Sequence, residues 1–182
     1  MRIKPREYKL QDGRILTVRS VEGEDAAAYA ACRQKIYRET YFLARYPEEL
    51  EDLEKMRVGL EKCAESPLNF EVGAFCGEEA VGSLAVRQVR PHLKYRHRAV
   101  MGISLLKEYW GRGLGSFLMQ IAVEQAAANG FEQLELGVFE DNARAIALYK
   151  KFGFEKYGVS PRAFKLKDGT YRDEIIMVKM LK

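Results

Sequence analysis

A glycine-rich stretch, "WGRGLGSFLM" at residues 110–119, is the first candidate for chemistry in this chain. Gly111, Gly113 and Gly115 would let the backbone approach a ligand closely, because a Cβ at these positions would hold the ligand away. An apolar run at helical spacing follows, and the N–H groups and dipole at a helix start favour an anion such as a phosphate. Arg112 adds a charged donor. The stretch therefore predicts a phosphate-binding turn, with a glycine-rich turn that binds no ligand as the alternative.

Two common phosphate-binding patterns fit this stretch poorly. A mononucleotide P-loop ends in Gly-Lys-Ser/Thr, whereas Gly115 is followed by Ser116 and Phe117. A dinucleotide G-x-G-x-x-G pattern that starts at Gly111 would have Ser116 as its third glycine, and the strands before it look antiparallel rather than parallel. The remaining interpretation is a pyrophosphate bound by successive backbone N–H groups, those of Arg112, Gly113, Leu114, Gly115 and Ser116.

A second motif, "EDNARAIALYKKFGF" at residues 140–154, follows the next predicted strand. Asn142 or its neighbour Asp141 predicts the N-cap of a short helix, because such side chains accept hydrogen bonds from the first helical N–H groups. Tyr149 shares one helical face with apolar residues, so periodicity alone favours a tyrosine packed in the core.

Together the two motifs resemble the acyl-coenzyme-A-binding core of the GNAT superfamily of N-acetyltransferases. The family signature is Q/R-x-x-G-x-G/A after a long strand and then, one helix and one strand later, an Asn-to-Tyr helix. Both parts occur in this order within about residues 95–157. Trp110 occupies the Q/R position, which removes a side-chain donor but leaves the backbone donors in place. The resemblance implies direct transfer of an acetyl group from acetyl-CoA to a primary amine in a ternary complex, without a metal.

The resemblance also implies where the coenzyme lies. It would lie between two splayed central strands, here Val100–Leu106 and Leu134–Phe139. Backbone groups near Ile103 and Leu105 would pair with the pantetheine arm, as an added strand pairs with a sheet edge. An amide of this strand would also polarise the thioester carbonyl, which is oxyanion-type stabilisation by a donor fixed in advance.

The second helix of the resemblance carries the side-chain roles. Tyr149 would act as the general acid toward the departing thiolate, a role that suits a phenol with a pKa of about 10. Asn142 would contact the coenzyme in addition to capping its helix. The sequence assigns no general base, and a water chain is an alternative. Four candidates near the predicted strands are interpreted as solvated surface groups: Glu71, Glu135, Glu140 and His97.

The acceptor pocket is expected between the early helices and the last hairpin. The end of the first predicted helix supplies Tyr37, Tyr41, Phe42 and Tyr46, and the hairpin supplies Arg162, Tyr171 and Asp173. Aromatic walls with a few charges suit a small-molecule amine or a peptide N-terminus as the acceptor. Core aromatic residues with solvated charges are the alternative.

The elements around the motifs predict one α/β domain over residues 1–182. The pattern around Asp12-Gly13 indicates a hairpin with its first main strand at Ile15–Arg19. Helices are predicted from Glu24 to about Tyr46 and then from Pro47 up to Ser66. The predicted order is β-α-α-β-β-β-α-β-α-β-β, a mixed and mostly antiparallel sheet flanked by helices, in agreement with the GNAT fold.

The composition is typical of a soluble globular protein, with 47% hydrophobic and 31% charged residues among 182. Three widely spaced cysteines, Cys32, Cys63 and Cys76, argue against a disulfide scaffold or a zinc site and are typical of a reducing cytoplasm. No window approaches the roughly 20 apolar residues of a membrane span, and the first residues lack a secretory signal. A cytoplasmic protein without membrane contact is therefore expected.

Two other functions compete with the enzyme. A non-catalytic coenzyme-A-binding regulatory module would use the same turn, but it would not need a leaving-group acid at Tyr149. A nucleic-acid-binding protein is disfavoured, because the net charge of +4 is mild and the basic run at residues 87–98 also fits a solvated hairpin. The sequence leaves the oligomeric state open, with a homodimer as one alternative.

Overall fold

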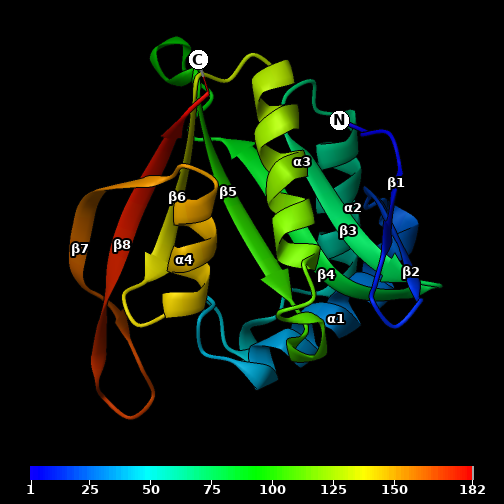
Figure 1. Ribbon diagram of the computed structural model, residues 1–182, viewed down its shortest axis with the longest axis horizontal. Helices are drawn as coiled ribbons and strands as arrows, with labels where there is room; N and C mark the ends of the chain where they lie inside the picture. Colours follow the sequence, from blue (N-terminus) through cyan, green and yellow to red (C-terminus); the bar gives the residue numbers. More distant parts are fainter. Residues whose placement is uncertain (182) are drawn as a thin grey trace.

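A computed structural model describes residues 1–181, in which eight strands form one sheet with helices on both faces (Figure 1). The strands are β1 (Arg6–Lys9), β2 (Ile15–Ser20), β3 (Phe70–Cys76), β4 (Glu79–Gln88), β5 (Arg98–Leu105), β6 (Gln133–Phe139), β7 (Glu155–Lys165) and β8 (Tyr171–Met180). The predicted order of elements is confirmed, with β1 as an additional short strand before the first main one. The predicted α/β fold is therefore present.

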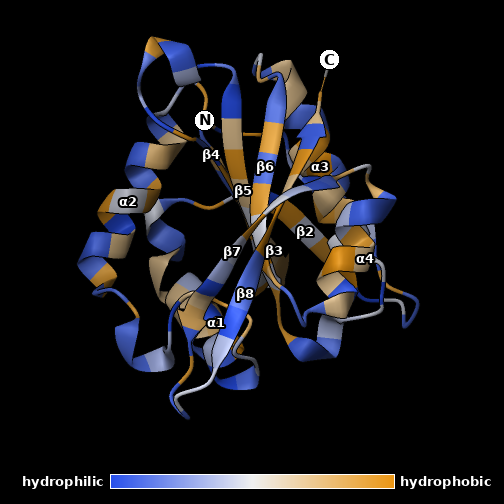
Figure 2. Ribbon diagram, turned by 90° about the vertical axis from the view of Figure 1, so that its left-hand side faces the viewer, coloured by the Kyte–Doolittle hydropathy of each residue, from blue (hydrophilic) through white to orange (hydrophobic). Residues whose placement is uncertain are grey.

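Four helices cover the sheet, two on each face. They are α1 (Ala26–Glu39), α2 (Leu53–Glu65), α3 (Leu114–Ala128) and α4 (Ala143–Lys151). Figure 2 shows α1 and α2 on one side of the sheet and α3 and α4 on the other. Because both faces are covered, β3 is almost entirely buried and its sequence, "FEVGAFC", is nearly continuous in apolar residues.

The strand order β1-β2-β3-β4-β5-β6-β8-β7 contains one parallel pair, β5 with β6. This pairing covers only Arg98–Val100 against Gln133–Glu135. Beyond it, β5 continues along β4 as far as Leu105, and β6 continues along β8 as far as Phe139. The two central strands therefore diverge and leave an opening in the middle of the sheet.

The first helix is shorter than predicted. It ends at Glu39, and Thr40 is extended with φ −154° and ψ 148°. The aromatic residues that follow turn toward the sheet instead of continuing the helix: the ring centroids of Tyr41 and Phe42 lie 6.0 and 5.9 Å from that of Phe139. Packing of these rings against Phe139 of β6, with Phe42 half-buried, outweighs the local helical preference.

The second helix also begins later than predicted. Pro47 opens a 3₁₀ turn, Pro47–Glu49, and α2 starts only at Leu53. Asp52 caps the helix, because its Oδ1 accepts from the backbone N–H groups of Glu54 and Lys55 at 2.9 and 3.3 Å.

In the described part of the chain, none of the helices has the length and hydropathy needed to cross a membrane. The three cysteines are free thiols; Cys32 and Cys63 are buried and Cys76 is half-buried.

Candidate functional site

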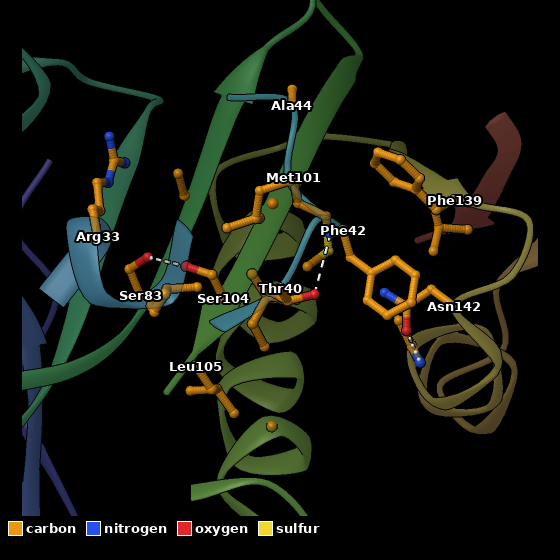
Figure 3. A pocket seen from close by; sticks show the side chains of 18 of the residues that line it. Arg33, Thr40, Phe42, Ala44, Ser83, Met101, Ser104, Leu105, Phe139 and Asn142 are labelled. Atoms are coloured by element: carbon orange, nitrogen blue, oxygen red, sulfur yellow. Dashed lines mark hydrogen bonds between the residues drawn. The ribbon is translucent and has the colours of Figure 1, made fainter. Parts of the chain in front are cut away.

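A cleft of about 1340 Å³ opens where β5 and β6 diverge. Its walls come from α1, β4, β5, the glycine turn, β6, α4 and β8. Gly102 on β5 and Gly137 on β6 both line it, so neither strand places a side chain in the opening at these two positions. Figure 3 shows Arg33 on one side of the cleft and Phe139 and Asn142 on the other, with the Ser83–Ser104 hydrogen bond of 2.9 Å between them.

The glycine turn leads directly into α3. Gly113 is the N-cap residue, has a φ of 84° and offers no side chain to cap the helix. Phe117 donates to the Gly113 carbonyl at 3.1 Å, which leaves the N–H groups of the first helical turn without an acceptor in the described chain. Gly111, Gly115 and Ser116 face the cleft as well. The turn thus presents backbone donors and the positive end of a helix dipole to the cleft.

Arg112 has its side chain outside the cleft. Its Nε donates to the Glu108 carbonyl at 2.7 Å, and its Nη1 lies 2.9 Å from Asp12 Oδ2 in the β1–β2 turn. Tyr8 holds the backbone of Arg112 in place, because its hydroxyl donates to the Arg112 carbonyl at 2.8 Å. The charged contact predicted for Arg112 is therefore absent from this arrangement, and only its backbone N–H remains near the predicted position. Leu114 is fully buried, so it too offers only its backbone.

A different arginine faces this end of the cleft. Arg144, in the first turn of α4, lies with its guanidinium carbon 5.1 Å from the centre of the Trp110 ring. Trp110 in turn donates its indole N–H to the Leu105 carbonyl at 2.9 Å. Both residues line the cleft. Sequence reasoning missed Arg144, although its place two residues after the predicted N-cap Asn142 was a usable signal.

The inner edge of β5 offers backbone groups to the opening. Leu106 donates to the Val81 carbonyl at 3.1 Å, and Val89 donates to the Arg98 carbonyl at 3.1 Å, so even-numbered residues of this strand point their backbone groups toward β4. Alternation along a strand then directs the N–H groups of Ile103 and Leu105 toward the opening. This is the orientation that the resemblance implies for the two residues.

Tyr149 lies on α4 and lines the cleft, and 6% of its surface is exposed. Its hydroxyl makes no hydrogen bond to any residue that the structure describes. Loss of hydration on burial raises the pKa of this phenol to about 12. Asn142 caps α4, with its Oδ1 accepting from Ala145 N at 3.2 Å, and its amide group remains available on the cleft wall (Figure 3).

Glu71 is buried rather than solvated, contrary to the sequence interpretation. The carboxylate accepts hydrogen bonds from the Tyr29 hydroxyl, from Arg33 Nη2 at 2.9 Å and from Arg87 Nη2. Burial, and then the nearby Glu71 charge, raise the pKa of Tyr29. This cluster joins α1, β3 and β4 at the side of the cleft that α1 lines, and it already provides the Glu71 carboxylate with three donors.

Glu135 is buried as well, with a carboxylate that is fully engaged. Arg98 Nε lies 2.6 Å from its Oε1, and the Tyr157 hydroxyl lies 3.0 Å from its Oε2. The hydrogen bonds from Arg98 are the largest cause of its lowered pKa.

Glu140 is exposed, as interpreted, and accepts from Asp173 N at 3.1 Å. Arg87 and Arg98, at the two ends of the basic run 87–98, thus neutralise buried carboxylates.

The aromatic wall of the cleft differs in part from the predicted one. Tyr37 and Phe42 line the cleft, whereas Tyr41 donates to Asp141 Oδ2 at 2.7 Å, and the Tyr46 hydroxyl accepts from Lys167 N at 3.0 Å, both outside it. None of the three predicted hairpin residues, Arg162, Tyr171 and Asp173, lines the cleft.

Two neighbours of the predicted hairpin residues line the cleft instead. Phe164 stacks on Phe139 with ring centroids 3.7 Å apart, and Glu174 lies next to Asp173 on β8. Successive residues of a strand face opposite sides of the sheet, so a prediction that is off by one residue selects the wrong face.

The comparison with protein families agrees with this geometry. The model described as "Acetyltransferase (GNAT) family" matches residues 25–154, which include the glycine turn and α4. The chain belongs to the GNAT family of acetyltransferases. Among the described residues of this GNAT protein, no group of three or more His, Cys, Asp or Glu side chains could hold a metal ion.

Relatives of this GNAT protein include two with named activities. The L-amino acid N-acetyltransferase AaaT of Escherichia coli is 32% identical over 121 residues, which are 66% of this chain and 74% of that protein. The N-alpha-acetyltransferase RimI of Mycobacterium tuberculosis is 33% identical over 103 residues, which are 56% of this chain and 61% of that protein.

The crystal structure of a GNAT-family acetyltransferase from Streptococcus pneumoniae superposes with a TM-score of 0.86 at 30% identity. It covers 92% of this chain and 99% of that chain, so the likeness extends beyond the coenzyme-binding motifs.

Proposed function

We propose that this GNAT protein transfers an acetyl group from acetyl-CoA to the primary amine of a small molecule, directly and within a ternary complex. The observation that carries the proposal is the opening between β5 and β6, which has backbone donors along one edge and the uncapped start of α3 at one end. We take residues 1–182 as one domain, because segments from α1 to β8 line one cleft.

The residues around the opening fit coenzyme A. The pyrophosphate would bind the N–H groups of Arg112, Gly113, Leu114, Gly115 and Ser116. Arg144 would supply the positive charge in place of Arg112, whose guanidinium is paired with Asp12. The backbone groups of Ile103 and Leu105 would bind the pantetheine arm and polarise the thioester carbonyl. Asn142 would contact the coenzyme through its free amide group.

Tyr149 is the proposed general acid. Its hydroxyl lies in the cleft wall without a partner among the described residues, and its raised pKa keeps the proton in place at neutral pH. The phenol would give this proton to the departing thiolate. A packed core tyrosine would ordinarily find a partner for its hydroxyl, which is the observation that favours the catalytic role.

Two acceptor classes remain, and the cleft favours the smaller one. Residues 46–48 contact the turn between β7 and β8, because Lys167 binds both the Tyr46 hydroxyl and Glu48. This contact joins the segment after α1 to the β7–β8 turn outside the cleft. Together with the aromatic wall of Phe42, Phe139 and Phe164, it favours a compact amine such as the amino acids named for the Escherichia coli relative. A peptide N-terminus, as named for the mycobacterial relative, is the second candidate.

A thiol-release assay tests the proposal. Acetyl-CoA would be supplied with amino acids, polyamines, aminoglycosides and N-terminal peptides in turn, and release of free coenzyme A would be followed. We expect turnover with at least one compact amine, and a higher melting temperature with acetyl-CoA, because a ligand at 100 times its Kd adds about 2.7 kcal/mol to the stability. Binding without turnover for every amine would favour the non-catalytic coenzyme-A-binding module.

A further inference from the structure

Glu174 lies where a side chain of Gly137 would otherwise be. A Cβ built on Gly137 would come within 2.0 Å of Glu174 Oε1 and 2.7 Å of its Cδ. Glycine inside a strand weakens that strand and often marks a place where another group approaches the backbone closely. The missing side chain on β6 thus makes room for a carboxylate that comes from β8.

The face of the sheet on which Glu174 lies follows from its pairing. Glu174 is directly opposite Phe139 in the β6–β8 register, and directly opposed side chains share a face. Phe139 faces the segment after α1, because its ring contacts that of Phe42. Glu174 therefore lies on the acceptor side of the opening, beside an aromatic wall that Phe164 completes.

Glu174 also differs from the other carboxylates of the cleft in its partners. Glu71 binds Arg33 and Arg87, Glu51 lies 3.7 Å from Arg33, and Asp141 lies 2.9 Å from Arg172. Glu174 is half-buried and has no ion pair or hydrogen bond from its side chain to residues 1–181. A carboxylate of this kind, next to aromatic faces, attracts a cation.

We propose that Glu174 binds the ammonium group of the acceptor and accepts its proton, so that it is the general base of the transfer. The proposal rests on the proposed acetyltransferase function and adds the base that the sequence did not reveal. Gly137 serves the same role indirectly, by leaving the space in which the carboxylate lies.

The protons of this step balance. Glu174 takes one proton from the ammonium group, and the freed electron pair forms the C–N bond as the C–S bond breaks. Tyr149 gives its proton to the thiolate, and the nitrogen then loses a second proton, which restores the phenol. The proton on Glu174 passes to solvent. The net change is ammonium plus thioester to amide, thiol and one released proton.

The test compares Glu174→Gln with the parent protein on one active acceptor. Glutamine keeps the size but accepts no proton, so we expect kcat/KM for the amine to fall by about 10²–10⁴-fold at neutral pH. Acetyl-CoA affinity by calorimetry should stay within about two-fold, because Glu174 lies on the acceptor side. Glu155→Gln on β7 makes the same charge change at an exposed site outside the cleft and should leave kcat/KM unchanged.

A second acceptor separates a base from a merely positioning residue. The same assay would use a less basic analogue of the active amine, such as the amide of an amino acid, more of which is already neutral. The deficit of Glu174→Gln should shrink by at least about ten-fold with this analogue, since less depends on proton removal. An equal loss with both amines would overturn the assignment as base.

Gly137→Ala tests the same idea with Glu174 intact. Its Cβ would displace the carboxylate, so kcat/KM should fall in the same direction while acetyl-CoA still binds. Glu174→Asp provides a further comparison in case Glu174→Gln or Gly137→Ala folds poorly. It keeps a carboxylate and should therefore retain more activity than Glu174→Gln. Parental activity in a folded Glu174→Gln protein would overturn the inference but not the acetyltransferase function. A parent protein inactive with every amine would overturn both.

Discussion

The Tyr149 hydroxyl has no hydrogen-bond partner among the described residues. Tyr149→Phe therefore removes the hydroxyl without breaking a hydrogen bond in this part of the chain. Phenylalanine preserves the ring in its nearly buried position, so the free energy of unfolding should change by less than about 1 kcal/mol. If the hydroxyl protonates the leaving thiolate, kcat and kcat/KM should fall together by about 10²–10⁴-fold. Steady-state kinetics and urea unfolding measure the two quantities. Turnover at the parental rate would remove Tyr149 from the mechanism.

The raised pKa of Tyr149 has its own consequence for the pH dependence. An acid works in its protonated form, and this phenol loses its proton only as the pH rises through about 12, rather than about 10. The ratio of kcat/KM between the parent and Tyr149→Phe should therefore stay constant up to about pH 10. A ratio that halves near pH 10 would show an unshifted phenol.

Arg144 and Arg112 form a matched pair for the phosphate end of the cleft. Arg144 faces the cleft above Trp110, whereas Arg112 is paired with Asp12 outside it. A charge-assisted hydrogen bond contributes about 1.5–3 kcal/mol, so Arg144→Ala should raise the Kd for acetyl-CoA by roughly ten-fold or more. Arg112→Ala should raise it much less. Calorimetry on both variants decides, and the reverse order would restore the role predicted from the sequence for Arg112.

At the scale of the elements, the Glu71 cluster links α1 to β3 and β4 beneath the acceptor end of the cleft. Removing one partner of a buried ion pair leaves the others uncompensated, which costs about 3–5 kcal/mol. Glu71→Gln should lower the free energy of unfolding by roughly that amount, as measured by urea unfolding.

Glu124→Gln is the control for this change, because it breaks the exposed ion pair with Arg6, in which both side chains are about 40–45% exposed. We expect a loss of roughly 0–1 kcal/mol there. Equal effects of the two substitutions would mean that the Glu71 cluster does not hold α1 against the sheet.

The fold of the whole molecule brings together, from opposite faces of the sheet, the residues that we propose bind acetyl-CoA and the acceptor. The glycine turn and α4 accompany the helices on one face, and Phe42 and Glu174 lie on the face of α1. The two groups meet at the opening between β5 and β6, because parallel pairing of these strands stops at Val100 and Glu135. The ternary complex that we propose would require this arrangement, since both substrates would have to reach one point at the same time.

The parts of the fold that depend on neighbouring residues in the chain could be predicted from the sequence. The glycine turn, the capped helix with Asn142 and Tyr149, and the order of strands and helices all follow from local spacing, cap chemistry and periodicity. The prediction ended helix α1 near Tyr46 instead of Glu39, because aromatic residues compatible with a helix pack against β6 instead.

Which charged side chains face the cleft depends on contacts between residues far apart in the sequence. Glu71 and Glu135 look like surface residues in a linear pattern, but arginines distant in sequence allow both to be buried. Arg112 is paired outside the cleft with Asp12, a hundred residues away, whereas Arg144 lines the cleft. On β8, Asp173 was predicted to line the acceptor pocket, but Glu174 lines the cleft instead. Pairing with β6 sets the face, because Glu174 lies opposite Phe139, and a one-residue difference along a strand moves a side chain to the other face of the sheet.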